Sequence, residues 1–154
     1  MGTERKETFG NDGVGVRGNI MNHSELTQSI LECGFEVSNE LGIGFLESVY
    51  ESAMEIALTQ SGLSVVRQAP LNVLFRGRPA GRFQIDLLVE NLVIVELKAT
   101  SALIPEHKMQ TLNYLRASGL PVALLMNFGT PRLEFRRYEN RFGSTPSHLS
   151  PSSL

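Results

Sequence analysis

The sequence lacks the features of a secreted or membrane-spanning protein. Its only cysteine, Cys33, excludes an intrachain disulfide framework and a zinc site built from cysteines alone. No apolar run reaches the roughly 18 to 20 residues that a membrane span needs, and the longest runs, LVIVEL and PVALLMNF, have the length of strands. The N-terminal stretch is charged and glycine-rich and has no apolar core of a secretory signal. We therefore expect a cytoplasmic protein without a membrane segment.

An excess of positive charge is also missing, since 14 Lys and Arg residues stand against 16 Asp and Glu residues, for a net charge of −2. Proteins that bind nucleic acid are often basic, so this balance argues mildly against such a partner. A bound divalent cation would offset it by adding two positive charges where a phosphate lies. Arginines gather in two places, for which a solvated rim is the simpler interpretation; they are Arg67, Arg76, Arg78 and Arg82, and Arg132, Arg136 and Arg137.

The two ends of the chain have no regular apolar pattern. Residues 1–22 contain glycines without apolar periodicity, and residues 140–154 are rich in serine and proline. We expect these segments to be disordered tails. Residues 23–139 then form one domain, of a size usual for a single hydrophobic core.

Within this domain the apolar spacing changes from helical to strand-like and back. Helices are predicted with Ser24 as the N-cap of the first, from about Gly44 to Gly62, and from Pro105 to Gly119. Leu46, Val49 and Met109 are among their expected core residues. Pro70 suggests an edge or a bulge in the first strand, and RGRP suggests a turn. Strands are predicted over about 64–75, 81–89, 92–99, 121–128 and 132–138. This order indicates an α/β fold with a mixed central β-sheet flanked by helices.

Three charged residues interrupt the apolar strands. Asp86 lies within QIDLL, and Glu96 and Lys98 follow the run LVIV. Central strands rarely carry charges without a partner. Glu96 and Lys98 share a face because side chains repeat every second residue. A three-residue loop, Glu90 to Leu92, would place Asp86 opposite Glu96, whereas a two-residue loop would place it opposite Leu97. The apolar pattern leaves both registers open.

Opposed carboxylates about 5 Å apart repel by roughly 3 kcal/mol at an effective dielectric constant near 20. The pair persists when a cation lies between the two groups or when one of them is protonated. Carboxylate and backbone carbonyl oxygens suit Mg²⁺ or Mn²⁺. An ammonium group such as that of Lys98 would orient a water or stabilise charge on phosphorus. An E-x-K triplet alone occurs by chance, however, and an Asp–Glu pair can also be two residues of an exposed rim.

Two predicted helices carry polar pairs on one face. Glu47 and Tyr50 are three residues apart, and Gln110 and Tyr114 are four apart. A core aromatic ring with its hydroxyl at the edge is the simpler interpretation of either tyrosine.

These segments together resemble a known family. GFLESVY has the G-x-x-E-x-x-Y arrangement of the GxxExxY family, and the chain is similar to that family at IDLLVENLVIVELKA, HKMQTLNYLRASGLPVALLMNFG and PRLEF, over about residues 24–138. The family resembles the PD-(D/E)XK nuclease superfamily, and Gln110-x-x-x-Tyr114 resembles the Q-x-x-x-Y motif of its RecB-type branch. Two positions depart from the pattern: Ile85 stands where the superfamily often has proline, and Ser38 where the family often has histidine.

The resemblance implies a restriction-endonuclease-like core and a nuclease that depends on Mg²⁺ or Mn²⁺. Its expected partner is nucleic acid, DNA more than RNA, and a homodimer or a protein partner is left open. The alternative is a catalytically silent nuclease-fold module that binds nucleic acid or a protein. The implied metal ligands are Asp86, Glu96 and the backbone carbonyl of Leu97, with Glu47 acting directly or through water. Lys98 would act on the attacking water, and Tyr50, Gln110 and Tyr114 would bind the substrate or support the site.

Overall fold

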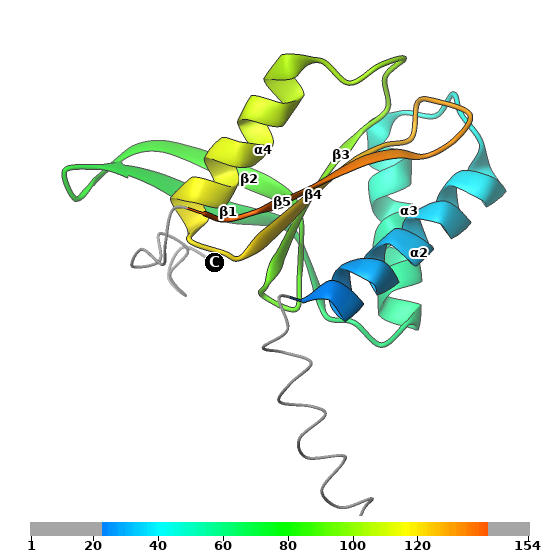
Figure 1. Ribbon diagram of the computed structural model, residues 1–154, viewed down its shortest axis with the longest axis horizontal. Helices are drawn as coiled ribbons and strands as arrows, with labels where there is room; N and C mark the ends of the chain where they lie inside the picture. The colour runs from blue at the N-terminus through cyan, green and yellow to red at the C-terminus, as the bar shows by residue number, and fades with distance from the viewer. Residues whose placement is uncertain (1–22, 142–154) are drawn as a thin grey trace, which may run out of the picture.

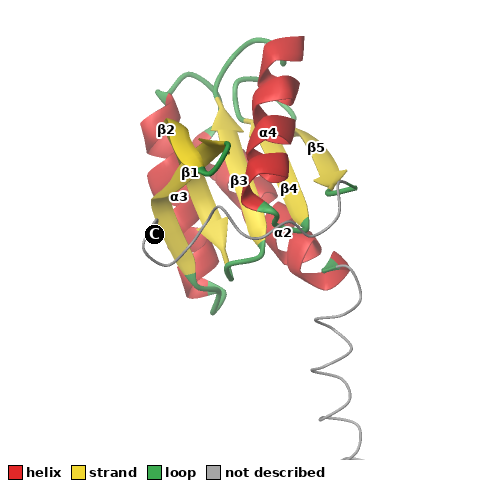
Figure 2. Ribbon diagram, turned by 90° about the vertical axis from the view of Figure 1, so that its left-hand side faces the viewer, coloured by secondary structure: helices red, strands yellow, loops and turns green. Residues whose placement is uncertain are grey.

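The computed structural model describes residues 23–141, which form helices on both faces of a five-stranded sheet. Helices α2 and α3 cover one face and α4 covers the other (Figures 1 and 2). Of the expected disordered tails, 1–22 and 140–154, residues 1–22 and 142–154 lie outside the described residues, whereas Asn140 is hydrogen-bonded to the carbonyls of Leu115, Leu120 and Pro121. The elements are α2 (Ser24–Leu41), α3 (Glu47–Gln60), β1 (Val65–Phe75), β2 (Arg78–Val89), β3 (Val93–Lys98), α4 (Pro105–Ser118), β4 (Val122–Asn127) and β5 (Glu134–Glu139).

The sheet has the strand order β1-β2-β3-β4-β5. Only β3 and β4 run parallel, and α4 connects them, while the other neighbours are antiparallel. The predicted mixed sheet flanked by helices is therefore confirmed. In the described part of the chain, no helix is both long and apolar enough to cross a bilayer.

Two apolar cores lie on the two faces of the sheet. One packs Ile30, Tyr50 and Met54 of α2 and α3 against the sheet, and the other packs Tyr114 and Leu115 of α4. Strands β3 and β4 contribute to both cores, which explains why their sequences are almost continuously apolar.

The predicted helix starts need correction. Residue His23, with φ of 62°, precedes α2, and no side chain caps the helix, so Ser24 is its first residue and not the N-cap. Helix α3 starts at Glu47 because Gly44 has φ of 112°, which no helix accommodates. The core face of α3 consequently carries Tyr50 and Met54, whereas Leu46 is 77% exposed.

Two other residues expected in the core are also exposed. Val49 is 37% exposed, and Met109 is 55% exposed because α4 turns Tyr114 and Leu115 toward the sheet.

Strand β1 is an edge strand, as Pro70 indicated, since an edge needs no N–H on its outer side. Pro70 itself pairs regularly with Gln84. The irregularities lie instead at Gln68, with φ of 52°, and between Val73 and Leu74. The turn is shorter than the predicted RGRP turn. Phe75 pairs with Arg78, so the turn consists of Arg76 and Gly77, which both have positive φ. The resulting β1–β2 hairpin projects from the body of the molecule (Figure 1).

The loop between β2 and β3 has three residues, because Val89 pairs with Val93. Glu90 and Asn91 both take left-handed conformations, with φ of 54° and 55°. Glu90 is also fixed from outside the loop, since its carboxylate accepts a hydrogen bond from the backbone N–H of Ser64 at 2.7 Å. This is the register that brings Asp86 toward Glu96.

Asn127, at the end of β4, holds the segment that follows β3. Its buried amide accepts hydrogen bonds from the N–H groups of Thr100 and Gly129, both at 3.0 Å, and donates one to the carbonyl of Thr100 at 3.0 Å. A Cβ on Gly129 would overlap the backbone of Thr100, so glycine is required for this close approach. The backbone that follows Lys98 is thereby fixed.

We expect Asn127→Ala to lower the free energy of unfolding by about 1–3 kcal/mol, because it leaves buried backbone groups without partners. Urea denaturation would measure the change. Asn39→Ala, at an exposed position of α2, is the matched control and should stay within about 0.5 kcal/mol of the wild type. Equal stability of the two variants would contradict the role assigned to Asn127.

Candidate active site

The carboxylates of Asp86 and Glu96 meet where β2 and β3 separate. Backbone pairing of these strands is recorded from Val89–Val93 to Leu87–Val95. Beyond it, the N–H of Asp86 donates to Oε2 of Glu96 at 2.9 Å, and the N–H of Leu97 donates to Oδ2 of Asp86 at 2.8 Å. Each acid therefore binds the backbone of the opposite strand, and the two side chains converge at one place.

Burial makes this pair costly to ionise. It raises the pKa of Glu96 to about 8, and the neighbouring charge of Asp86 adds to the effect. Burial likewise raises the pKa of Asp86 to about 6, against the opposing effect of the hydrogen bond from Leu97. At low pH, protonation of one acid removes the repulsion between the two carboxylates. When both are ionised, a bound cation would offset that repulsion.

The stability of the metal-free protein should therefore fall as the pH rises. Both folded-state pKa values lie above the ordinary values of 3.8 and 4.5, so the native state holds protons that the unfolded state releases. The contribution is complete below about pH 4 and is lost as the pH passes through 6 and then 8.

Melting temperatures in EDTA between about pH 5 and pH 9 would test this dependence. Glu96→Gln should flatten the decline, because the amide has no proton to lose. Glu36→Gln, on the exposed side of α2, should decline like the wild type. Parallel curves for wild type and Glu96→Gln would contradict the assigned titration.

Lys98 lies two residues after Glu96 on β3, and its side chain is bound by a residue of α4. Its Nζ donates to Oε1 of Gln110 at 3.2 Å, and Nε2 of Gln110 donates to the hydroxyl of Tyr114 at 3.3 Å. The charge of Lys98 acts on both acids by lowering their pKa values. The Q-x-x-x-Y pair thus lies beside the lysine, with Gln110 contacting it directly.

Glu47 is the first residue of α3 and is exposed. Its charge raises the pKa values of both Asp86 and Glu96, which places it near the pair. An acid at this position also interacts favourably with the N-terminus of the helix. Glu47, Asp86, Glu96 and Lys98 therefore gather in one region, where β2 and β3 separate between α3 and α4.

Tyr50 does not reach this region with its hydroxyl. The side chain is fully buried, donates to the carbonyl of Gly42 at 2.6 Å and accepts from the N–H of Phe45 at 3.3 Å. Its ring stacks on Phe128 with centroids 4.9 Å apart. Tyr50 holds the loop that leads to Glu47 and so supports the site from within the core.

Glu51, one helical turn after Glu47, was not predicted from the sequence. This buried carboxylate accepts hydrogen bonds from Nε of Arg67 at 3.1 Å and from Nε2 of Gln68 at 2.9 Å, and its charge raises the pKa of Asp86. Gln68 lies between the pairs that flank Asp86 on β2. Glu51 thus ties α3 to the edge strand beside Asp86, and its four-residue spacing from Glu47 was the available signal.

The donor set suits a hard divalent cation. A backbone N–H donor holds one oxygen of each carboxylate in place. The other oxygen of each makes no hydrogen bond to the described residues. Within residues 23–141, no three His, Cys, Asp or Glu side chains are arranged as preformed ligands. Mg²⁺ keeps several waters and is often held by one or two carboxylates together with substrate phosphates. The two carboxylates of Asp86 and Glu96 fit that mode.

Comparison with known proteins indicates the family to which the chain belongs. A family model described as the PD-(D/E)XK nuclease superfamily matches residues 24–138, which include every element of the described fold except the last residue of β5. No curated protein and no solved structure matches the chain. This description is of the superfamily and does not specify the GxxExxY family or the RecB-type branch. Because the superfamily model covers most of the sequence, the chain belongs to the PD-(D/E)XK nuclease superfamily.

Proposed function

We propose that this protein is a Mg²⁺- or Mn²⁺-dependent nuclease that hydrolyses phosphodiester bonds, with DNA as its expected substrate rather than RNA. The observation that carries the proposal is the reciprocal arrangement of Asp86 and Glu96, with Lys98 next to them. A purely structural role would not require two carboxylates to be buried against each other at the point where two strands separate.

Each residue of the proposed site would have a role that follows from its chemistry. Asp86 and Glu96, with the backbone carbonyl of Leu97, would hold the metal, and Glu47 would contact it through water. The bound cation would polarise the phosphate and lower the pKa of a coordinated water. Lys98 would orient the attacking water and stabilise charge that develops on the phosphoryl oxygens. Gln110 would keep the Lys98 ammonium in place through their hydrogen bond.

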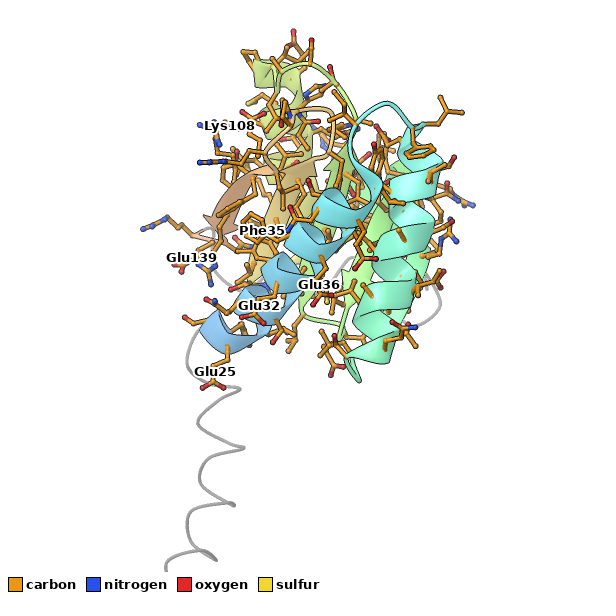
Figure 3. The ribbon with its side chains drawn as sticks, turned by 90° about the vertical axis from the view of Figure 1, so that its right-hand side faces the viewer. Glu25, Glu32, Phe35, Glu36, Lys108 and Glu139 are labelled. Atoms are coloured by element: carbon orange, nitrogen blue, oxygen red, sulfur yellow. The ribbon has the colours of Figure 1, made fainter. Side chains whose placement is uncertain are left out.

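The acidic composition is compatible with this function because the charges are segregated. Glu25, Glu32 and Glu36 project from α2, which contributes none of the proposed site residues (Figure 3). The β1–β2 hairpin, in contrast, carries three exposed arginines between residues 70 and 85 and no acid. Positive charge is thus available on the hairpin for a phosphate backbone. The buried free thiol of Cys33 fits a reducing, cytoplasmic setting.

A direct test measures cleavage of single- and double-stranded DNA and RNA by the wild-type protein, with Mg²⁺, Mn²⁺ or EDTA. We expect cleavage with either metal and none in EDTA. Folded wild-type protein that cuts no substrate with either metal would overturn the proposal. It would favour the alternative, a silent module that binds nucleic acid or a protein partner, which oligonucleotide binding without cleavage would identify.

A further inference from the structure

A groove outside the acid pair lies between the β1–β2 hairpin and α4. It has a volume of about 870 Å³, and its walls include Leu74 and Phe83 of the hairpin and Met109, Asn113 and Tyr114 of α4. This volume falls within the roughly 300–1,000 Å³ usual for small-molecule pockets. The groove is therefore large enough to hold a nucleobase.

The groove adjoins the proposed site through Gln110. Gln110 and Tyr114 line it, and the same Gln110 accepts the hydrogen bond from Nζ of Lys98 at 3.2 Å. A nucleotide in the groove would therefore have its neighbouring phosphate close to Lys98 and the acids.

The walls offer an aromatic face with polar groups beside it. Phe83 is 44% exposed, and its ring is tilted by 44° against that of Tyr114, with centroids 5.6 Å apart. The Phe83 ring also lies against Gly81. A Cβ at Gly81 would come within 2.9 Å of the ring, so the ring can lie against the strand only because residue 81 has no side chain. Met109, which no core packing explains, is 55% exposed on the opposite wall.

The charges around the groove are mostly positive. Its lining carries one cation, Arg116, and one acid, Glu106, and three further arginines, Arg76, Arg78 and Arg82, are exposed on the hairpin. Aromatic faces flanked by cations are the combination that binds unpaired nucleic-acid strands. In a duplex the faces of the bases are covered by their stacked neighbours, and only the base edges are presented in the grooves.

We propose that this groove holds an unpaired base of the substrate strand against Phe83, which makes single-stranded or locally opened nucleic acid the substrate of the adjacent site. The proposal rests on the nuclease function proposed above. The groove would position the strand, and the acid pair with Lys98 would cut next to the base it holds.

The test is designed to separate base stacking from cleavage. The probe is a short single-stranded DNA that contains 2-aminopurine, titrated in EDTA, and the same strand in a duplex serves for comparison. The variants are Phe83→Ala, Phe83→Leu, which keeps apolar volume without an aromatic face, and Phe83→Trp, which keeps the face. Phe75→Ala removes a 61% exposed aromatic residue of the same hairpin that does not line the groove. Melting temperatures near that of the wild type establish that each variant is folded.

We expect the wild type to bind the single strand more tightly than the duplex. Phe83→Ala and Phe83→Leu should weaken single-strand binding by roughly 5- to 150-fold, the range of one base–aromatic contact. Phe83→Trp should retain binding, and Phe75→Ala should stay within about twofold of the wild type. Wild-type binding by the Ala and Leu variants, an equal loss in Phe75→Ala, or equal affinity for the duplex would overturn the proposal.

Cleavage assays then distinguish the two proposals. Binding that depends on Phe83, in a wild type that cuts nothing with Mg²⁺ or Mn²⁺, would retain the groove and reject the nuclease. Cleavage of single strands by Phe83→Ala with the kcat/KM of the wild type would retain the nuclease and reject the groove.

Discussion

Lys98→Ala should reduce metal-dependent cleavage by about a hundredfold or more, the effect of losing one preorganised electrostatic contact. The ammonium group would act on the water and on charge that exists mainly in the transition state. Metal affinity should be unchanged or slightly higher, because a positive charge beside the two carboxylates is removed. Single-turnover cleavage rates and metal titrations by calorimetry would measure the two effects separately.

Lys108→Ala is the matched control, since Lys108 is an exposed cation on α4, three residues after Pro105 (Figure 3). Its cleavage rate should remain near that of the wild type. If the wild type cuts and Lys98→Ala cuts equally well, the mechanism is wrong even though the fold remains. If Lys98→Ala loses metal binding and cleavage together, the lysine organises the site and does not act on the reaction.

Mg²⁺ should raise the melting temperature of the wild type, because it binds the native state and not the unfolded chain. At about 100 times Kd the stabilisation is roughly 2.7 kcal/mol, which for a domain of this size corresponds to roughly 10 °C. Asp86→Asn should remove most of this shift, since the amide supplies no charge to a hard cation. Thermal unfolding with increasing Mg²⁺ would measure it.

We also expect an effect of Asp86→Asn in the absence of metal. Asp86→Asn removes the neighbouring charge that raises the pKa of Glu96, so in EDTA at neutral pH it should be at least as stable as the wild type. Glu134→Gln, on β5, should keep the full Mg²⁺ shift. A full shift in Asp86→Asn would count against Asp86 as a ligand.

Much of the fold follows from local spacing. The start of α4 at Pro105 and its end before Gly119 were predicted by the residues that favour helix termini. The two consecutive strands around the acids were predicted by their apolar runs. The start of α3 was placed too early, because its apolar pattern continues through Gly44, whose backbone conformation is not visible in the sequence.

The register between β2 and β3, on which the meeting of Asp86 and Glu96 depends, could not be predicted from the sequence. Both faces of these strands are apolar near the turn, so neither loop length was favoured by burial alone. Ser64, which is distant in sequence, binds Glu90 and thereby helps to fix the three-residue loop. Glu51 and Asn127 were missed for the same reason, since a buried polar residue is recognised by its partners, and those partners come from other segments.

The position of the acid pair on one short hairpin has a consequence for how the site forms. Only nine residues separate Asp86 from Glu96, so closing this loop costs little chain entropy, and the pair depends on few long-range contacts. Glu47 and Gln110, in contrast, are brought to the pair by the packing of separate helices. In the proposed nuclease, the β2–β3 hairpin would therefore supply the metal ligands by itself, while changes in α3, α4 or the projecting β1–β2 hairpin would alter which strand is admitted and leave those ligands in place.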